Sequence, residues 1–417
     1  WGNYVLERTL GFNGSLSFIE FFKTHPLSLQ SPKDIFLNTS FSSFGPYDGK
    51  VISAFWNLNI YTNQRHLAFS YAIFLLFILS IYNFEKSPKK FSFVFVALLG
   101  ILVGAFPFIH LPIFGMMIIA LFIFFIAYSK IRFKIFVILL ISTFLTFPQI
   151  FYMGRIQIGT SFLKPGYLVS DLSLLNFLKY WFFNLGPALM LSPFGFMIAK
   201  KEQRKLLLPF IIFFVVGNLF QFSTEIAANH KFFNLFTIAL NMFAASFLVY
   251  LWRKNTFTKL VTILLSISLT LSGVIDLFPI INDHYIEISD IPKNKTASFI
   301  IQNTPKDSVF LNSSFLYDPA SLAGRKIYLG WPYFSWSSGY DTNKRYEKMK
   351  KLLAPENMKS LCESLTEEKI DFIEVQNPTP LENVTIDYNF FNKNFLLVYQ
   401  DLEQNLKIYD TRISCKN

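Results

Sequence analysis

The chain has 417 residues, of which 52% are apolar and 52 are phenylalanine, and it carries a net charge of +11. This composition excludes an ordinary soluble protein and predicts a polytopic membrane protein. Residues 66–280 hold 17 Lys and Arg against five Asp and Glu, whereas 281–417 hold 16 against 18. The basic excess therefore reports membrane topology, and a nucleic-acid partner is not expected.

Residues 1–65 mix aromatic and polar residues and are expected to form an external loop region. Within them, residues 15–23 predict a short amphipathic helix lying at the membrane surface. The chain starts at Trp1 without a signal peptide, so an upstream piece is expected, with an odd number of membrane helices if the true N-terminus is cytoplasmic.

Residues 66–280 predict a transmembrane helical domain, because each span needs roughly 20 apolar residues to cross a bilayer core about 30 Å thick. The second and third helices are separated by Pro107 and Pro112, which favours a hairpin over one long helix. Gly100 and Gly104 form a GxxxG pair that predicts close helix packing. The expected spans are 67–84, 91–108, 112–128, 135–152, 175–198, 206–222, 232–251 and 260–280.

Basic residues fall in alternate loops between these helices, around residues 86–90, 130–134, 200–205 and 253–259. By the positive-inside rule those loops face the cytoplasm, and both chain ends lie outside. The longer loops, residues 1–65 and 153–174, are then on the external side. We therefore expect the function to reside there.

Residues 281–417 have a soluble composition and predict an extracytoplasmic α/β domain. Cys362 and Cys415 both lie in it, and the sequence leaves open whether they are bonded. The expected strands are 308–311, 325–329, 372–375, 395–399 and 406–409, and the expected helices 342–353 and 356–368. The fold class is thus a mostly α membrane protein with about eight transmembrane helices and a small α/β domain.

Polar residues follow one face of the seventh predicted helix. His230, Asn234, Thr237 and Asn241 stand at i, i+4, i+7 and i+11, and so share one face of an α-helix. Such a stripe indicates either interhelical hydrogen bonds or the wall of a hydrated substrate cavity.

Basic residues and imidazoles collect at the predicted outer helix ends, where they either anchor helices against headgroups or form a site for a phosphate. The candidate phosphate-binding residues are Arg65, His66, His110, Arg155, His230 and Lys231.

A general base for an acceptor hydroxyl has few candidates on this side, because outer acidic residues are scarce. Asp48 and Glu225 are the leading candidates for this base, and Asp34 is an alternative. The structural explanation for Asp48 is a turn, and that for Glu225 is a position near a helix N-terminus. The sequence has no P-loop, GxGxxG, HExxH or GxSxG motif. The need for a cofactor stays unknown, and although a divalent metal is possible, no motif indicates one.

A membrane block elaborated on one side and followed by an external α/β domain resembles the GT-C superfamily of polyprenyl-phosphate-sugar-dependent glycosyltransferases. The run 320–336 looks like the external domains of bacterial members, and its Gly330–Trp336 segment is similar to the WWDYG motif of oligosaccharyltransferases, without the aspartate. The resemblance implies a catalytic carboxylate in the first external loop. The candidate acceptor-binding residues are Arg325, Trp331, Tyr333 and Trp336, with an aromatic platform that could also be a domain core or a membrane-docked surface.

Together these features predict a multi-pass protein of the plasma membrane that transfers a sugar from a polyprenyl-phosphate donor to an envelope acceptor, saccharide or protein. The expected partners are the lipid bilayer, the donor and the acceptor. A transporter or flippase of lipid-linked sugars and a non-catalytic envelope scaffold are the alternatives.

Overall fold

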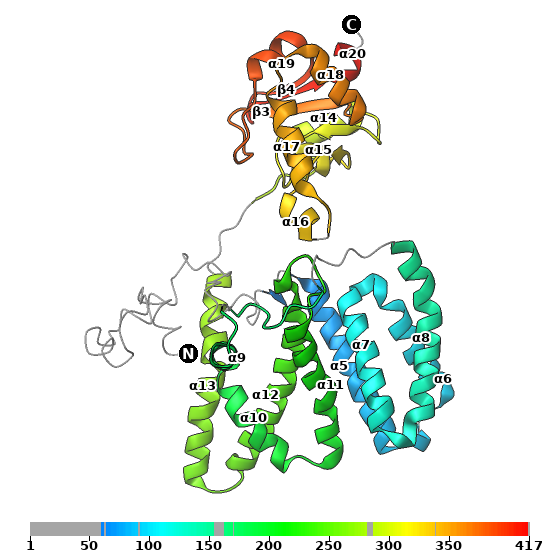
Figure 1. The fold of residues 1–417 in the computed structure, drawn as a ribbon. Helices are drawn as coiled ribbons and strands as arrows, with labels where there is room; N and C mark the ends of the chain where they lie inside the picture. Colours follow the sequence, from blue (N-terminus) through cyan, green and yellow to red (C-terminus); the bar gives the residue numbers. More distant parts are fainter. Residues whose placement is uncertain are drawn as a thin grey trace, which may run out of the picture. The chain divides into compact units, whose positions relative to one another are not determined.

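The computed structural model describes residues 60–61, 64–90, 92–153, 162–169, 171–281, 287–337 and 339–415. The chain divides into two compact units, 1–284 and 285–417. The first is helical and the second combines helices with a sheet (Figure 1). The predicted surface helix at residues 15–23 lies outside the described residues.

One helix covers most of each of seven of the eight apolar ranges, and the range 175–198 is divided between two helices. Among the described residues, the helices of the first unit are α5 (Arg65–Lys86), α6 (Phe93–Ala105), α7 (Pro107–Ala127), α8 (Arg132–Met153), α9 (Leu174–Leu185), α10 (Pro187–Ile198), α11 (Lys201–Leu219), α12 (His230–Trp252) and α13 (Thr256–Ile281), with 3-10 turns η2 (Pro88–Lys90), η3 (Ser129–Ile131) and η4 (Ile226–Asn229).

Fewer helices than predicted meet both the length and the apolar composition of a membrane span in the part of the chain that the structure describes. Among the described residues, four segments are long and apolar enough to cross a membrane: His66–Lys86, Pro107–Ala127, Ser129–Met153 and Ile226–Trp252. The pair α9 and α10, bent by 85°, adds a fifth if the two form one span. Helix α6 has 13 residues, which at 1.5 Å each reach about 20 Å and fall short of a bilayer core. The prediction of a membrane protein is supported, while eight spans stay a prediction.

Glycines set the closest helix contacts of this unit. A Cβ on Gly100 would lie 2.8 Å from Cβ of Ile141, and one on Gly104 would lie 2.8 Å from Cβ of Leu145, so the GxxxG pair brings α6 against α8 as predicted. A Cβ on Gly195 would lie only 1.8 Å from the carbonyl oxygen of Phe243. The backbones of α10 and α12 therefore touch there.

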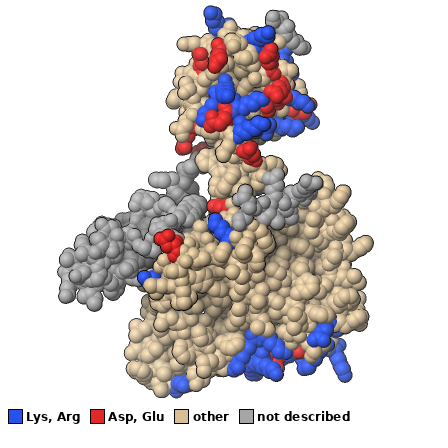
Figure 2. Space-filling model, viewed as in Figure 1, with Lys and Arg blue, Asp and Glu red and all other residues tan. Residues whose placement is uncertain are grey.

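The basic loops come together at one end of the helical unit. Lys134 Nζ donates to the carbonyl oxygen of Pro88 at 2.5 Å, and Lys205 Nζ donates to that of Ala127 at 2.9 Å. Figure 2 shows blue side chains gathered at this end of the unit. This arrangement is the one the positive-inside rule requires, and which side of a membrane the end faces stays a prediction.

The second unit is built on a five-stranded mixed sheet, whose strands lie at the predicted places. The strands are β1 (Val309–Leu311), β2 (Lys326–Ile327), β3 (Phe372–Gln376), β4 (Leu396–Asp401) and β5 (Leu406–Asp410), in the order β2-β1-β3-β5-β4. Strand β1 is parallel to β2 and β3, whereas β5 is antiparallel to β3 and β4.

Short helices accompany this sheet. They are α14 (Lys295–Asn303), α15 (Pro319–Leu322), α16 (Pro332–Ser337), α17 (Thr342–Leu353), α18 (Met358–Glu367), α19 (Tyr388–Asn394) and α20 (Thr411–Ser414). Helices α17 and α18 match the two predicted ranges. Each begins at a polar residue, Asp341 or Asn357, whose side chain accepts a hydrogen bond from the first turn.

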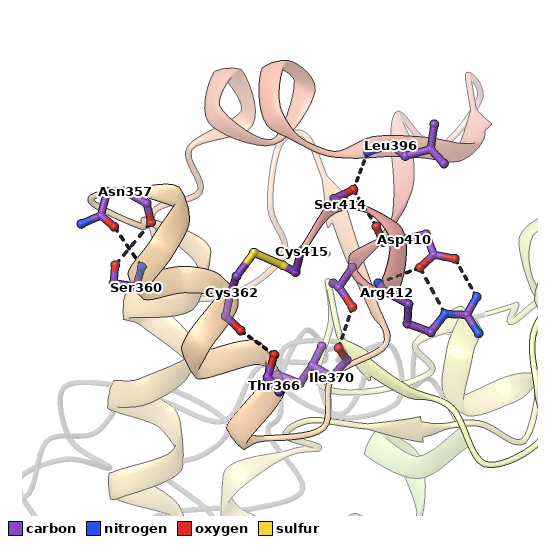
Figure 3. Close-up of a disulfide and its surroundings, with 11 residues drawn as sticks. Asn357, Ser360, Cys362, Thr366, Ile370, Leu396, Asp410, Arg412, Ser414 and Cys415 are labelled. Carbon is purple, nitrogen blue, oxygen red and sulfur yellow. Dashed lines mark hydrogen bonds and ion pairs between the residues drawn. A yellow bond between two sulfur atoms is a disulfide. The ribbon is translucent and has the colours of Figure 1, made fainter. Parts of the chain in front are cut away.

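A disulfide joins Cys362 in α18 to Cys415 at the chain's end, which answers the question that the sequence left open (Figure 3). The turn that presents Cys415 is held by Ser414, whose hydroxyl donates to the carbonyl oxygen of Asp410 and accepts from the N–H of Leu396. The disulfide therefore fixes the end of the sheet to a helix 53 residues earlier.

Candidate functional site

The connection between α11 and α12 sets the position of His230. The amide of Asn229 donates to the carbonyl oxygens of Gly217 at 2.9 Å and Phe220 at 2.5 Å, so the end of α11 is bonded to the start of α12. The hydroxyl of Tyr167 donates to the carbonyl oxygen of Ala227 at 3.0 Å. Residues of the predicted external loop 153–174 thus brace the turn from which His230 projects.

Four of the predicted phosphate-binding residues lie together around this turn. The rings of His66 in α5 and His110 in α7 are stacked, with centroids 5.3 Å apart. Lys231 Nζ lies 3.5 Å from Nε2 of His230. His110 interacts electrostatically with His66, Lys231 and His230. Three helices far apart in sequence therefore contribute to one cluster, which we call the histidine–lysine cluster: His66, His110, His230 and Lys231.

A break in α7 places His110 in this cluster. Its backbone is non-helical, with φ −163° and ψ 93°, directly before the turn that contains Pro112. The N–H of Ile113 donates to Nδ1 of His110 at 3.4 Å. Nδ1 is thus the acceptor in this bond, which leaves Nε2 as the ring nitrogen that can donate to a ligand.

Two tyrosines that the sequence analysis missed border the cluster. The hydroxyl of Tyr71 in α5 donates to the carbonyl oxygen of Lys231 at 3.1 Å. Tyr61 packs edge-on against Tyr71, with centroids 6.1 Å apart. Tyr71 lies on the apolar face of α5, so its sequence context indicates only a core position.

The polar stripe of α12 is enclosed in the first two turns of the helix. Asn234 is 3% exposed, and Tyr61 and His230 both come close enough to interact with its side chain. Yet by distance and angle neither amide atom of Asn234, nor the hydroxyl of Thr237, makes a hydrogen bond with the described residues. Leaving such groups dry costs about 1–3 kcal/mol each, so a water or a polar ligand is expected beside them.

Asn241, the last residue of the predicted stripe, is exposed. It lies on the same helix face as His230, but one turn beyond the buried part. The described structure therefore confines the enclosed polar region to the first two turns of α12.

Of the acidic candidates, the structure describes Glu225. It lies partly buried at the residue before η4 and interacts electrostatically with Lys231. Asp48 and Asp34 lie outside the described residues, as do Arg155 and the side chain of Arg65. Among the described residues, no group of three or more His, Cys, Asp or Glu has the arrangement of a metal site.

The predicted acceptor-binding residues separate into two places. Arg325 lies at the end of α14, where its guanidinium donates to the carbonyl oxygens of Ile301 at 3.1 Å and Thr304 at 2.8 Å. Cations at a helix C-terminus bind its last carbonyls and stabilise its dipole. Helix capping thus accounts for Arg325.

The aromatic members of that set lie together in α16 and at the residue before it. Trp331, Tyr333 and Trp336 are all exposed, with the rings of Tyr333 and Trp336 6.1 Å apart. Their role in acceptor binding stays a prediction.

A buried acidic pair in the second unit was missed by the sequence analysis. Glu374 in β3 is fully buried, and its Oε1 accepts a hydrogen bond from the hydroxyl of Ser313 at 2.6 Å. Asp318, also fully buried, accepts from the N–H groups of Ser313, Ser314 and Ala320.

Burial raises the pKa of Asp318 to about 6, against the opposing effect of those hydrogen bonds. Burial first, and the neighbouring Asp318 second, raise the pKa of Glu374 well above its usual range. The signal in the sequence was an acid inside the apolar run 372–375, at a strand position that the sheet buries.

Neither a protein-family model nor a characterised sequence matches the chain. What can be said of its class comes from its own fold. In the part of the chain that the structure describes, it is mostly helical, with four or five candidate membrane spans and a separate unit with a small mixed sheet.

Proposed function

We propose that this protein is a membrane glycosyltransferase of the GT-C type, which transfers a sugar from a polyprenyl-phosphate donor to an acceptor on the outer face of the plasma membrane. The observation that carries the proposal is the histidine–lysine cluster, with Glu225 close to Lys231, and with the buried side chain of Asn234 and the enclosed hydroxyl of Thr237 one and two turns further along α12.

The chemistry needs a cation for the leaving phosphate and a base for the acceptor. When the acceptor oxygen bonds to the anomeric carbon, the bond from that carbon to the phosphate oxygen breaks, and the phosphate leaves with the electron pair. The Lys231 ammonium and the Nε2–H of His110 stabilise the developing charge, because both donate to phosphate oxygens. Glu225 accepts the proton of the acceptor hydroxyl. Asp48 is the alternative base.

Two observations support a site on the outer face of the membrane. The cluster lies at the helix ends opposite the basic loops: α5, α7 and α12 each begin at the cluster and end at a basic loop. The Cys362–Cys415 disulfide suits an oxidising compartment, where disulfides persist.

A transporter or flippase of lipid-linked sugars is the second candidate, since α9 and α10 are bent by 85° at Gly186. Broken helices near a polar region are typical of transporters. Gly186 has φ 54°, a conformation that glycine adopts without strain. Both functions require that the cluster bind a lipid-linked phosphate.

Binding and transfer are separable in the full chain in lipid nanodiscs. Native mass spectrometry with a short polyprenyl phosphate is expected to show binding that Lys231→Gln and His110→Gln remove. Lys130→Gln, in a basic loop at the other end of the unit, is the matched control and retains binding.

Transfer is then assayed with polyprenyl-phosphate hexoses. Glu225→Gln is expected to keep donor binding and lose transfer, with Asp48→Asn tested alongside. Transfer that survives both changes would refute the assignment of the base. Donor movement between leaflets without transfer would favour the flippase.

A further inference from the structure

A patch of exposed aromatic rings lies on the second unit. In residues 331–340, five of ten side chains are aromatic and none is charged. Phe334 is 60% exposed and Tyr340 69% exposed. We call this patch, with Tyr317 from the neighbouring loop, the aromatic lobe: Tyr317, Trp331, Tyr333, Phe334, Trp336 and Tyr340.

The lobe stands on a fixed base. The side chain of Asn312, after β1, donates to the carbonyl oxygen of Leu329 at 2.7 Å and accepts from its N–H at 3.0 Å, so the loops after β1 and β2 are bonded together. Phe315 packs against Trp331 on one side and Tyr346 on the other, at 6.2 and 6.0 Å. The rings are therefore presented by a packed scaffold.

Charge separates the lobe from the rest of the unit's surface. Elsewhere the surface carries ion pairs such as Lys348 with Glu367 at 2.7 Å, whereas Figure 2 shows the lobe that carries α16 in tan. Soluble surfaces seldom expose a contiguous apolar patch of this kind without a partner for it.

The chain itself limits what can cover the lobe. Helix α13 ends at Ile281 and α14 begins at Lys295. The residues between them, 282–294, span at most about 45 Å when fully extended. The linker therefore keeps the start of α14 within that distance of the end of α13, so a membrane that contains the apolar helices is within its reach. Trp and Tyr are the residues enriched where protein meets lipid headgroups, because their rings are apolar and their polar tips reach water.

We propose that the aromatic lobe inserts into the headgroup region of the bilayer that holds the helical unit, with Phe334 the deepest ring. A saccharide is the other ligand with an affinity for aromatic faces. Sugar sites, however, place amide or charged side chains beside the ring to bind hydroxyls, and residues 331–340 contain neither. The proposal stands whether or not the protein transfers sugar.

Depth-dependent quenching tests the insertion in the full chain. Both native cysteines are in the disulfide, so a bimane label on Phe334→Cys reports from one place. The matched control is Lys393→Cys in α19, at the opposite end of this unit from α16 (Figure 1). Both labelled proteins go into nanodiscs with and without phosphatidylcholine carrying a doxyl group near the headgroup.

The label at position 334 is expected to lose most of its fluorescence in doxyl lipid, and the label at 393 to keep it. Tyr317→Cys, on the neighbouring loop, is a second labelling site in case the change at 334 disturbs α16. Equal fluorescence in both lipids at 334 and 317 would overturn the proposal. A label that doxyl lipid does not quench but that responds to added oligosaccharide would assign the lobe to a saccharide instead.

Discussion

Replacing Glu374 by glutamine tests the account of the buried acidic pair. Glutamine keeps the shape of the protonated carboxyl, and its amide oxygen can still accept the hydrogen bond from Ser313, but it cannot ionise. The pKa of Glu374 is raised by burial in the folded unit, so the folded state holds a proton that the unfolded state releases. Stability is therefore lost as pH rises from the unfolded pKa toward the folded one.

The size of the effect follows from that difference. An unfolded glutamate titrates near pH 4.3, and each pH unit above that value costs about 1.36 kcal/mol of stability for as long as the folded carboxyl stays neutral. Glu374→Gln is expected to recover most of this, with no gain at pH 4. Asp318, whose pKa is about 6, contributes to the loss of stability between about pH 4 and 6 in both proteins.

The free energy of opening of the second unit is measured by hydrogen exchange of the full chain at pH 6 and pH 8, corrected for intrinsic rates. The relevant peptides cover β1 and β3. Glu382→Gln, an exposed residue of the same unit, is the matched control and is expected to change nothing. An unchanged or smaller opening free energy at pH 8 in the Glu374→Gln variant would refute the reasoning.

Ser313→Ala should lower the opening free energy by about 1–3 kcal/mol, because an oxygen of Glu374 loses its only hydrogen-bond donor among the described residues.

Three further changes follow from the packing. Gly195→Ala should disrupt the α10–α12 contact, because its Cβ would overlap backbone, whereas Gly115→Ala, where nothing lies within 4 Å, should be tolerated; thermal unfolding in nanodiscs distinguishes them. Cys362→Ser should destabilise the second unit by about 4 kcal/mol from loop entropy alone, measured by its proteolysis rate and reproduced by reduction of the unchanged protein. Arg325→Ala should speed hydrogen exchange in the last turn of α14 and leave β3 unchanged, and uniform change in both would contradict a capping role.

The five strands of the second unit and its helices α17 and α18 were predictable from sequence, because the strands are short apolar runs and the two helices are charged segments between them. Strand β3 is an example: its run at 372–375 marked the element within one residue. The burial of Glu374 was not predictable, since the sequence does not tell which neighbours cover a strand. An antiparallel β5 on one side and a parallel β1 on the other make β3 central.

The apolar helices of the first unit were predictable as elements, but among the described residues only four of the eight predicted ranges, or five with the bent pair, are candidate spans. Apolar content identifies a helix, whereas spanning depends on uninterrupted length, and Gly186 interrupts the range 175–198 with an 85° bend. Likewise α11 begins with Lys201 and four more charged or amide side chains, which leaves about 14 residues where roughly 20 apolar ones are needed.

Part of the histidine–lysine cluster could be predicted from the topology of the helices alone. Short basic loops join α5 to α6 and α7 to α8, so successive helices run in opposite directions, and His66 and His110 must then share one end of the unit. That step needs the sequence alone. Contact between the two imidazole rings depends on the packing of the helices. The backbone break at His110 accompanies its stacking on His66, and the hydrogen bond from Tyr71 to the carbonyl oxygen of Lys231 holds α5 against α12. Loops can thus predict which residues share an end, but only packing decides which of them form a site.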